Sequence, residues 1–489
     1  MKKVLIIITF TIAFLPTAHA ITHTNKTFMS VPTPHDYLPM KQTSWHRIIK
    51  QGSQDEHPFG GTFQVVPFYR TSNRETSLGK YFGTNGKNEL TVAAPDQDVD
   101  IQTGLIAHRY NTTSPFSDLI KLNPEHTTCG AYFSYQQDLD KLHNRLFLRF
   151  NIPIVEVTND LHLTNTSPNK DPVSGKSILD FFNGTFKQID DSTNLQEPLT
   201  SAKIDGPNKK SGVADVECML GYILTEKEEY EMSGHIKTVL PTGNEPTGEY
   251  LFEAIVGNGK HWGIGAGIDA SLNISKSETD SFEFLAHLDY TYLFREDETR
   301  TIGYRNGINN RGPGSPIEDL AITLPWFYYI LGGENGKKGT LPLANILTRP
   351  VSVLPGSKLQ GHAAFAYHRN DTTFDFGYSF FAQEGEKVRV KSWTDNKYAP
   401  AAPGYDTSNA FDMSDANRVL GGWINATELD TELAATPAIL KHSIHGAIAY
   451  THTDWKNPFM FAGGFSVDWT QDNATPTGYT LWGKVGTSF

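Results

Sequence analysis

The chain has 489 residues, a formal net charge of −12 and only two cysteines. This acidic balance excludes a nucleic-acid-binding surface that covers the chain, and two cysteines are too few for a disulfide framework. The 42 glycines, the 12% of aromatic residues and a hydrophobic fraction of 38% indicate a β-rich chain with many turns. Cys129 and Cys218 would either pair or remain as separate thiols that are buried or face lipid.

Residues 1–20 are typical of a secretory signal peptide. They carry two lysines, an apolar run and the sequence Ala18-His19-Ala20, so we expect cleavage after Ala20. The alternative, an N-terminal membrane anchor, needs about 20 apolar residues, more than this run provides. No later segment has the length and apolarity of a transmembrane helix, but β-strands cross a bilayer with only about 10 residues each.

Residues 21–60 precede the first candidate strand and include His35, Tyr37, Trp45 and His46. We expect either a short periplasmic plug or a simple N-terminal tail.

Period-two alternation then marks candidate strands along the rest of the chain. In 458–469, Phe461, Phe465 and Trp469 share one face, while Ser466 and Asp468 lie on the other. One face would meet lipid and the other water. The twelve candidates are 62–70, 128–138, 145–157, 213–224, 230–240, 261–274, 281–295, 357–368, 372–383, 440–454, 458–469 and 479–489.

The connections between these strands alternate between long and short. An outer-membrane barrel has this asymmetry, with long extracellular loops and short periplasmic turns. A soluble β-sandwich also alternates in sequence, but nothing in its architecture sorts the loops in this way. The sequence therefore predicts an all-β, transmembrane, antiparallel up-and-down β-barrel over 61–489 with about 12 strands, or 14 or 16 if 71–127 and 296–356 each hide a hairpin.

The connection 296–356 contains LPWFYYILGG, which is unusually apolar for a solvated loop. Exposed aromatic clusters of this size usually mark contact surfaces. We expect the segment to fold into the lumen as a constriction or plug, with an extra hairpin or a cover over the mouth as alternatives.

The final stretch, YTLWGKVGTSF, alternates up to its last residue. It resembles the C-terminal signal strand of bacterial outer-membrane barrels, which ends in Phe and is read by the barrel assembly machinery. Thr487 and Gly483 are less hydrophobic than that pattern prefers. The resemblance implies a bacterial outer-membrane location and an assembly signal made by Tyr479, Leu481, Val485 and Phe489.

A second resemblance covers residues 235–274, where a strand ends in a Pro-Thr-Gly turn and the next begins with a Gly-rich alternating run. This stretch is similar to outer-membrane transporters linked to aromatic-compound degradation. It spans only about forty residues, and glycine-rich turns also occur in unrelated barrels.

The faces opposite the apolar ones would form a polar lumen. So many ionisable groups cannot form a dry core without extensive pairing, and an excess of carboxylates would favour cations. The alternative is that the charges pair across strands and only keep the interior wet. The pore-lining candidates are Arg149, Asp215, Glu217, Glu231, His235, Lys237, Asp269, Glu283, His287, Asp289, His362, His368, Asp375 and Lys484, with Asn273, His445 and Asp468 beside them.

Catalytic and metal-binding motifs are missing from the sequence: it contains no HExxH, no CxxC pair and no GxSxG. Asp96, Asp98 and Asp100 begin like a calcium loop but lack its glycine and distal glutamate. We therefore expect no enzyme, cofactor or metal, but a channel of porin type for passive diffusion of small solutes. The alternative is an adhesive or structural barrel that binds partners through its long loops. Outer-membrane lipid and lipopolysaccharide would surround it, no nucleic acid would bind, and its oligomeric state is open.

Overall fold

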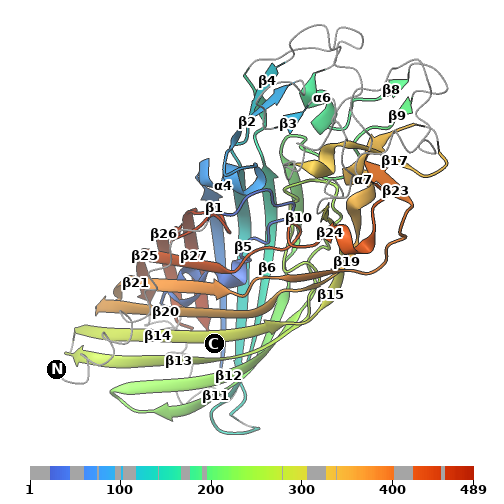
Figure 1. Ribbon diagram of the computed structural model, residues 1–489. Helices are drawn as coiled ribbons and strands as arrows, with labels where there is room; N and C mark the ends of the chain where they lie inside the picture. The colour runs from blue at the N-terminus through green and yellow to red at the C-terminus, as the bar shows by residue number, and fades with distance from the viewer. Residues whose placement is uncertain are drawn as a thin grey trace.

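The computed structural model is a closed β-barrel with a layer of loops at one end (Figure 1). The structure describes residues 22–44, 60–73, 76–93, 101–102, 117–140, 142–166, 177–189, 195–277, 279–304, 326–337, 339–400, 422–452 and 457–489. The predicted signal peptide, Trp45, His46 and the motif at 96–100 lie outside these ranges. The domain boundaries proposed at residues 20 and 60 remain predictions.

The barrel sheet is antiparallel throughout, and it closes through the pairs β27–β1, β1–β5 and β5–β6. Strands β10 and β11 pair with successive parts of β6, so that together they fill one of twelve places around the barrel. The strands are β1 (Gly61–Ser72), β5 (Glu125–Asp138), β6 (Leu146–Asp160), β10 (Asn208–Val213), β11 (Val216–Glu226), β12 (Tyr230–Leu240), β13 (Gly263–Lys276), β14 (Asp280–Leu293), β20 (Gly356–Arg369), β21 (Thr372–Gln383), β25 (Ile439–His452), β26 (Phe459–Thr470) and β27 (Gly478–Ser488).

Each of the twelve predicted ranges overlaps one of these strands, so the predicted fold class is confirmed. The alternatives with 14 or 16 strands are wrong: apart from the ends of β1, β5 and β20, the strands in the described parts of 71–127 and 296–356 lie outside the barrel sheet. Tight connections such as the one between β20 and β21 gather at one end, which we call the hairpin end. The other end carries the long connections and is called the loop end.

Alternation gives the barrel an apolar exterior. Phe376 on β21, Ile264 on β13 and Phe461 on β26 are 64%, 52% and 55% exposed, whereas polar side chains on the same strands, such as Ser379 and Ser466, are buried inside. The terminal strand follows this pattern, with Tyr479, Leu481, Val485 and Phe489 all on the exterior. Its role as an assembly signal remains a prediction.

The two cysteines lie on the exterior of strands that flank β6. Cys129 is opposite Glu156 and Cys218 is opposite Phe150, six residues further along the same strand. Six residues of strand span about 20 Å, far beyond the reach of a disulfide, and both thiols are free. We expect unchanged gel mobility on reduction, both for the wild type and for Cys129→Ser/Cys218→Ser. A reduction-sensitive shift of the wild-type monomer would contradict this.

The long connections fold into small sheets and short helices with a shared apolar core. Among the described residues, no helix has the length and apolarity needed to cross a membrane. The elements are β2 (Glu89–Ala93), β3 (Ile101–Gln102), β4 (Ser117–Lys121), β7 (Thr164–Asn165), β8 (Gln188–Ile189), β9 (Leu195–Gln196), β15 (Glu296–Thr301), β16 (Gly303–Tyr304), β17 (Leu331–Glu334), β18 (Leu341–Pro342), β19 (Thr348–Leu354), β22 (Lys387–Val390), β23 (Tyr398–Pro400), β24 (Leu429–Asp430), α4 (Thr76–Phe82), α6 (Ile178–Phe182), α7 (Leu343–Leu347), η4 (Phe327–Tyr329) and η6 (Ala426–Glu428).

The apolar segment of 296–356 belongs to this loop core. The Trp326 indole donates to Phe82 O at 2.7 Å, and the Tyr329 hydroxyl donates to Ala202 O at 2.6 Å. Both carbonyls belong to other loops, so the expected inward-folded constriction is wrong for the described residues 326–333. The aromatic cluster is apolar because it is the interior of a folded loop layer.

A buried cluster of charges supports this layer. The Arg300 guanidinium donates to Glu298 Oε2 at 2.6 Å and to Glu386 Oε2 at 2.5 Å, and also to the carbonyl oxygen of Ala434. His261 Nε2 lies 2.8 Å from Glu298 Oε1. The cluster joins β15 to the connections after β12 and β21.

This cluster predicts acid sensitivity of the loop layer. Burial alone would raise the pKa of Glu298, but the Arg300 guanidinium and His261 outweigh it and lower the pKa. A lowered pKa contributes stability that is present above about pH 4.3, the pKa in the unfolded chain, and lost as pH falls through the folded value. We expect the fluorescence of buried Trp326 to change as pH falls from 5 to 3. Glu298→Gln should reduce this response, and an identical response would contradict the assignment.

Candidate functional site

The N-terminal segment enters the barrel and contacts its inner wall. It contains two short helices, η1 (Pro34–Asp36) and α2 (Leu38–Gln42). Residues upstream are held in the loop layer, where Thr27 Oγ1 donates to Thr301 O at 2.5 Å. Residues 33–44 then lie against side chains of the barrel strands. We call residues 33–44 the lumen segment.

The first contacts of the lumen segment are ionic. His35 Nδ1 lies 3.0 Å from Glu217 Oε2 on β11. Asp36 Oδ2 lies 3.5 Å from Lys358 Nζ on β20. All four side chains are at most 9% exposed. Adjacent residues of the segment therefore contact two separate parts of the barrel wall, β11 and β20, with β12, β13 and β14 between them.

The end of the lumen segment is held by a buried lysine. Lys484 on β27 is 1% exposed, and its ammonium donates to Lys41 O at 3.0 Å and to Thr43 O at 2.6 Å. The last carbonyls of a helix have no partner within the helix, so a cation at this position satisfies them. Next to it, Ser44 Oγ donates to Asp375 Oδ2 at 2.9 Å.

Charged side chains on neighbouring strands form a continuous network beside the segment. Lys237 on β12 donates to Glu217 at 3.2 Å and also to Asp289 on β14, while His235 lies 3.2 Å from Asp289 Oδ2. These contacts cross β13 at Gly267, where a Cβ would come within 2.5 Å of the His235 ring. A residue without a side chain is needed there for the ion pairs to form.

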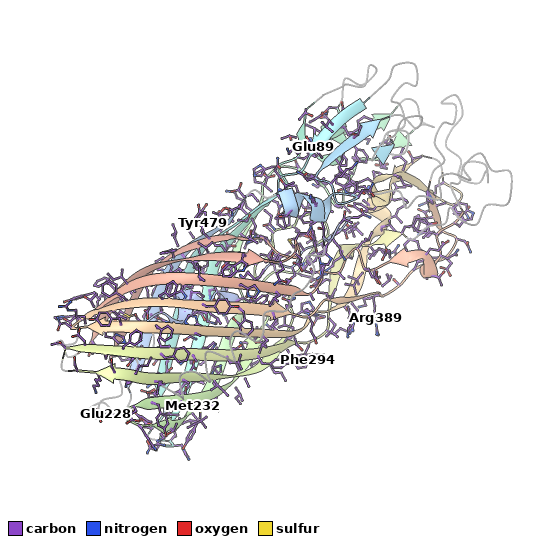
Figure 2. All side chains as sticks on the ribbon, turned by 60° about the vertical axis from the view of Figure 1, so that its left-hand side comes forward. Glu89, Glu228, Met232, Phe294, Arg389 and Tyr479 are labelled. Carbon is purple, nitrogen blue, oxygen red and sulfur yellow. The ribbon has the colours of Figure 1, made fainter. Side chains whose placement is uncertain are left out.

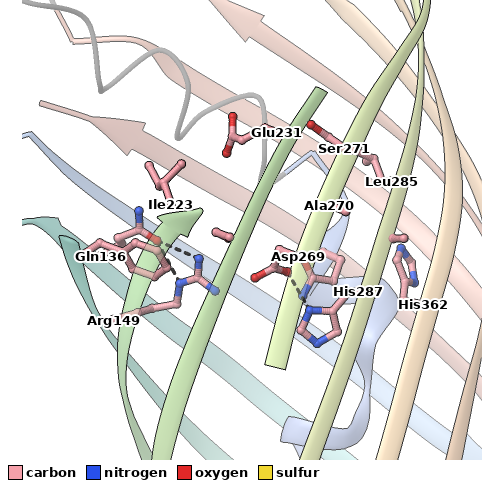
Figure 3. A pocket seen from close by; sticks show the side chains of 14 residues that line it. Gln136, Arg149, Ile223, Glu231, Asp269, Ala270, Ser271, Leu285, His287 and His362 are labelled. Atoms are coloured by element: carbon pink, nitrogen blue, oxygen red, sulfur yellow. Dashed lines mark hydrogen bonds and ion pairs between the residues drawn. The ribbon is translucent and has the colours of Figure 1, made fainter. Parts of the chain in front are cut away.

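A cavity lined by both polar and apolar side chains lies at the end of this network (Figure 3). Its volume is about 60 Å³. Arg149 donates to Gln136 Oε1 at 2.8 Å on one side, and His287 Nδ1 lies 2.7 Å from Asp269 Oδ1 on the other. Gln42 of the lumen segment also lines the cavity. The cavity is therefore bounded both by the wall and by the segment.

Histidines continue along the inner wall towards β25. The rings of His362 and His445 stack with centroids 5.0 Å apart, and both nitrogens of His445 lack a hydrogen-bond partner among the described residues. His368 lies 3.2 Å from Glu283 Oε2. Within the described ranges, no group of three or more His, Cys, Asp or Glu side chains could hold a metal ion.

The structure places the predicted pore-lining residues on the inner side of the barrel, with one exception. Asp215 lies in the break between β10 and β11, where its carboxylate accepts hydrogen bonds from the backbone N–H groups of Gly243 and Asn258 at 3.2 and 2.7 Å. It is fully buried and ties a loop to the wall. The period-two pattern cannot detect such a break, because the residues on both sides still alternate.

Three basic side chains of the inner wall are missing from the predicted set: Arg70, Lys358 and Lys441. Arg70 and Lys441 both lie over the Tyr37 ring of the lumen segment, 4.8 and 4.9 Å from its centroid, and both pair with Asp468. Each of them lies at or next to the end of a predicted strand. At a strand end it is hardest to assign whether a side chain points to the inside or the outside of the barrel. With them included, the predicted excess of carboxylates becomes small, and most of the charges lie in ion pairs.

No protein-family model matches this sequence, and a comparison with curated proteins gives no match.

Solved structures similar to this chain are barrels of outer membranes and transport units. The transport unit of the autotransporter AIDA-I from Escherichia coli is 8% identical, with 94% of this chain and 99% of that chain covered and a TM-score of 0.27. The NanC porin is 8% identical over 87% and 98%, with a TM-score of 0.27. A mutant of the TodX monoaromatic hydrocarbon channel is 10% identical over 88% and 89%, with a TM-score of 0.31.

Proposed function

We propose that this barrel is an outer-membrane channel for passive diffusion of small solutes, closed at rest by the lumen segment. The observation that carries the proposal is the position of residues 33–44 inside the barrel, where they contact charged side chains on separate strands of the wall, β11, β20 and β27. An apolar exterior and a polar interior support a membrane-spanning barrel with a hydrated passage. In a dry structural barrel so many buried charges would be destabilising, because they are costly to desolvate.

The orientation of the barrel in the membrane follows from the positions of its short and long connections. In outer-membrane barrels the short turns lie in the periplasm and the long loops outside. We therefore propose that the loop end faces the exterior. We assign no reaction to the lumen, because its ion pairs hold the segment and the wall together.

Passage of a solute requires the lumen segment to leave its contacts. The segment forms no continuous β-pairing with the wall; it is held by hydrogen bonds and ion pairs and by the packing of Tyr37 and Met40 against apolar side chains of the wall. Displacement must expose these apolar side chains as well as break the polar contacts, so we expect openings to be infrequent. Once the segment is displaced, Asp375 would line the passage together with Glu217 and Asp289, which pair with Lys237. We therefore expect a mild preference for cations.

An adhesive barrel is the competing proposal. The observation in its favour is the loop layer, which has its own buried core and could present a rigid binding surface. In that case the lumen segment would be a permanent seal.

Planar-bilayer recording distinguishes the two. The purified barrel should give stepwise openings, infrequent in the wild type, with a reversal potential in a salt gradient that indicates cation preference. A correctly folded barrel that never conducts, even when the lumen segment is weakened by substitution, would favour the adhesive proposal.

A further inference from the structure

A three-stranded sheet extends the barrel wall beyond its rim at the loop end. Its order, β15–β19–β22, repeats the order β14–β20–β21 of the barrel strands from which these strands continue. The inner face of the sheet packs against the loop core, with Val351, Val353 and Val388 buried there. The outer face is consequently left on the outside of the molecule.

This outer face is basic. Arg295, Lys387, Arg389 and Lys391 are all exposed on it. Asp297 is paired with Lys391, whereas within the described residues Lys387 and Arg389 make no ion pair. We call Arg295, Lys387 and Arg389 the basic patch.

The sheet register brings the patch together around Ser352. Arg389 is directly opposite Ser352, and Lys387 is opposite the adjacent outward position, Leu354. From the other side, Arg295 Nη1 donates to Ser352 O at 3.3 Å and lies 3.4 Å from its hydroxyl. Neighbouring strands are about 4.8 Å apart, so the cationic groups converge over an area the size of a phosphate group and its surroundings.

The patch lies immediately beyond the aromatic rim of the apolar exterior. Phe294, which precedes Arg295, is 42% exposed, and Trp262 on the adjacent strand is 49% exposed. Figure 2 labels Phe294 and Arg389 where the barrel meets the loop layer. Aromatic girdles mark the membrane–water interface of such barrels. The patch is therefore at the depth of lipid headgroups.

The patch differs from the same end of β5 and β6, where the exterior carboxylates Glu125, Glu156 and Asp160 lie in ion pairs with His162 and Lys209. The whole chain has a net charge of −12. A local excess of cations on an acidic protein, at headgroup depth, matches an anionic lipid.

We propose that the basic patch binds phosphate groups of lipopolysaccharide in the leaflet around the loop end. Guanidinium groups bind phosphate oxygens in bidentate fashion, and Ser352 adds a hydroxyl donor between them. The inference rests on the proposed membrane orientation, but it does not depend on whether the lumen conducts.

Native mass spectrometry of the folded barrel in detergent tests this with two probes, lipid A carrying its phosphates and dephosphorylated lipid A. We expect the wild type to retain the phosphorylated form selectively. Arg295→Gln/Lys387→Gln/Arg389→Gln should bind it about a hundredfold more weakly, because each basic residue near an anionic surface contributes roughly a factor of five. A matched control is Lys209→Gln/Lys210→Gln/Lys276→Gln, which removes three other exposed lysines and should bind like the wild type.

Equal binding by the triple variant and the wild type would overturn the proposal, as would equal retention of dephosphorylated lipid A. Complete displacement of lipid A by millimolar inorganic phosphate would assign the patch to free phosphate instead. Heat-dependent gel mobility verifies that each variant is folded. Conductance recorded separately distinguishes failure of this inference from failure of the channel proposal, since the triple variant should conduct like the wild type.

Discussion

Replacement of Lys484 by methionine should open the barrel. The substitution keeps most of the length of the side chain but leaves Lys41 O and Thr43 O without their donor. A hydrogen bond to a charged group contributes about 1.5–3 kcal/mol, so the lumen segment should dock about 2 kcal/mol more weakly. Its undocked population should then rise about 30-fold, and open probability in planar bilayers should rise with it.

Lys209→Met is the matched control, because Lys209 lies exposed on the outside of β10. It should leave open probability at the wild-type level. The barrel itself should still fold with Lys484→Met, because its strands are joined by backbone pairing, as β27 is with β1 and β26. A folded Lys484→Met barrel with unchanged open probability would mean that Lys484 does not hold the segment.

Replacement of Arg300 by methionine should unfold the loop layer while the barrel persists. Arg300 is 2% exposed and its guanidinium contacts both Glu298 and Glu386. Without it, two carboxylates remain buried with too little positive charge, and removal of one partner from a buried ion pair typically costs about 3–5 kcal/mol. We expect rapid cleavage of the loops by added trypsin at neutral pH, with the barrel fragment still shifting on heated gels.

Arg369→Met provides the comparison for this variant, because Arg369 is 70% exposed at the hairpin end. Its loops should be cleaved no faster than those of the wild type. If Arg300→Met resists trypsin equally well, the charge cluster does not stabilise the layer.

The barrel could be predicted from sequence because each strand repeats a simple rule over about ten residues. Residues such as Phe461, Phe465 and Trp469 face outward, and Asp468 faces inward, as alternation requires. Most lumen residues follow from the same rule, including the triad Glu217, Lys237 and Asp289. Loop sorting then gave the even strand number and the position of both barrel ends.

For the lumen segment, the sequence alone left two alternatives, a short plug or a simple N-terminal tail. Its helix α2 has five residues, too few for helical periodicity to register, and its partners are hundreds of residues away, as in the contact of Ser44 with Asp375. The loop core could not be predicted for the same reason, because its contacts join residues far apart in the sequence. Trp326, for example, is buried by Phe82 and Phe182, and no local sequence pattern encodes this contact. Long-range contacts of this kind form only once the closed barrel has brought these segments together.

The most direct measurement is the single-channel current of a variant in which residues 34–43 are replaced by a Gly-Ser linker of equal length. The linker keeps the connection between the loop layer and β1 but removes the side chains of His35, Asp36 and Tyr37, and with them the helix α2 that positions the carbonyls bound by Lys484. We predict sustained openings of this variant with cation preference, in contrast to infrequent openings of the wild type. A folded linker variant that stays as silent as the wild type would contradict the central claim that this segment closes the lumen.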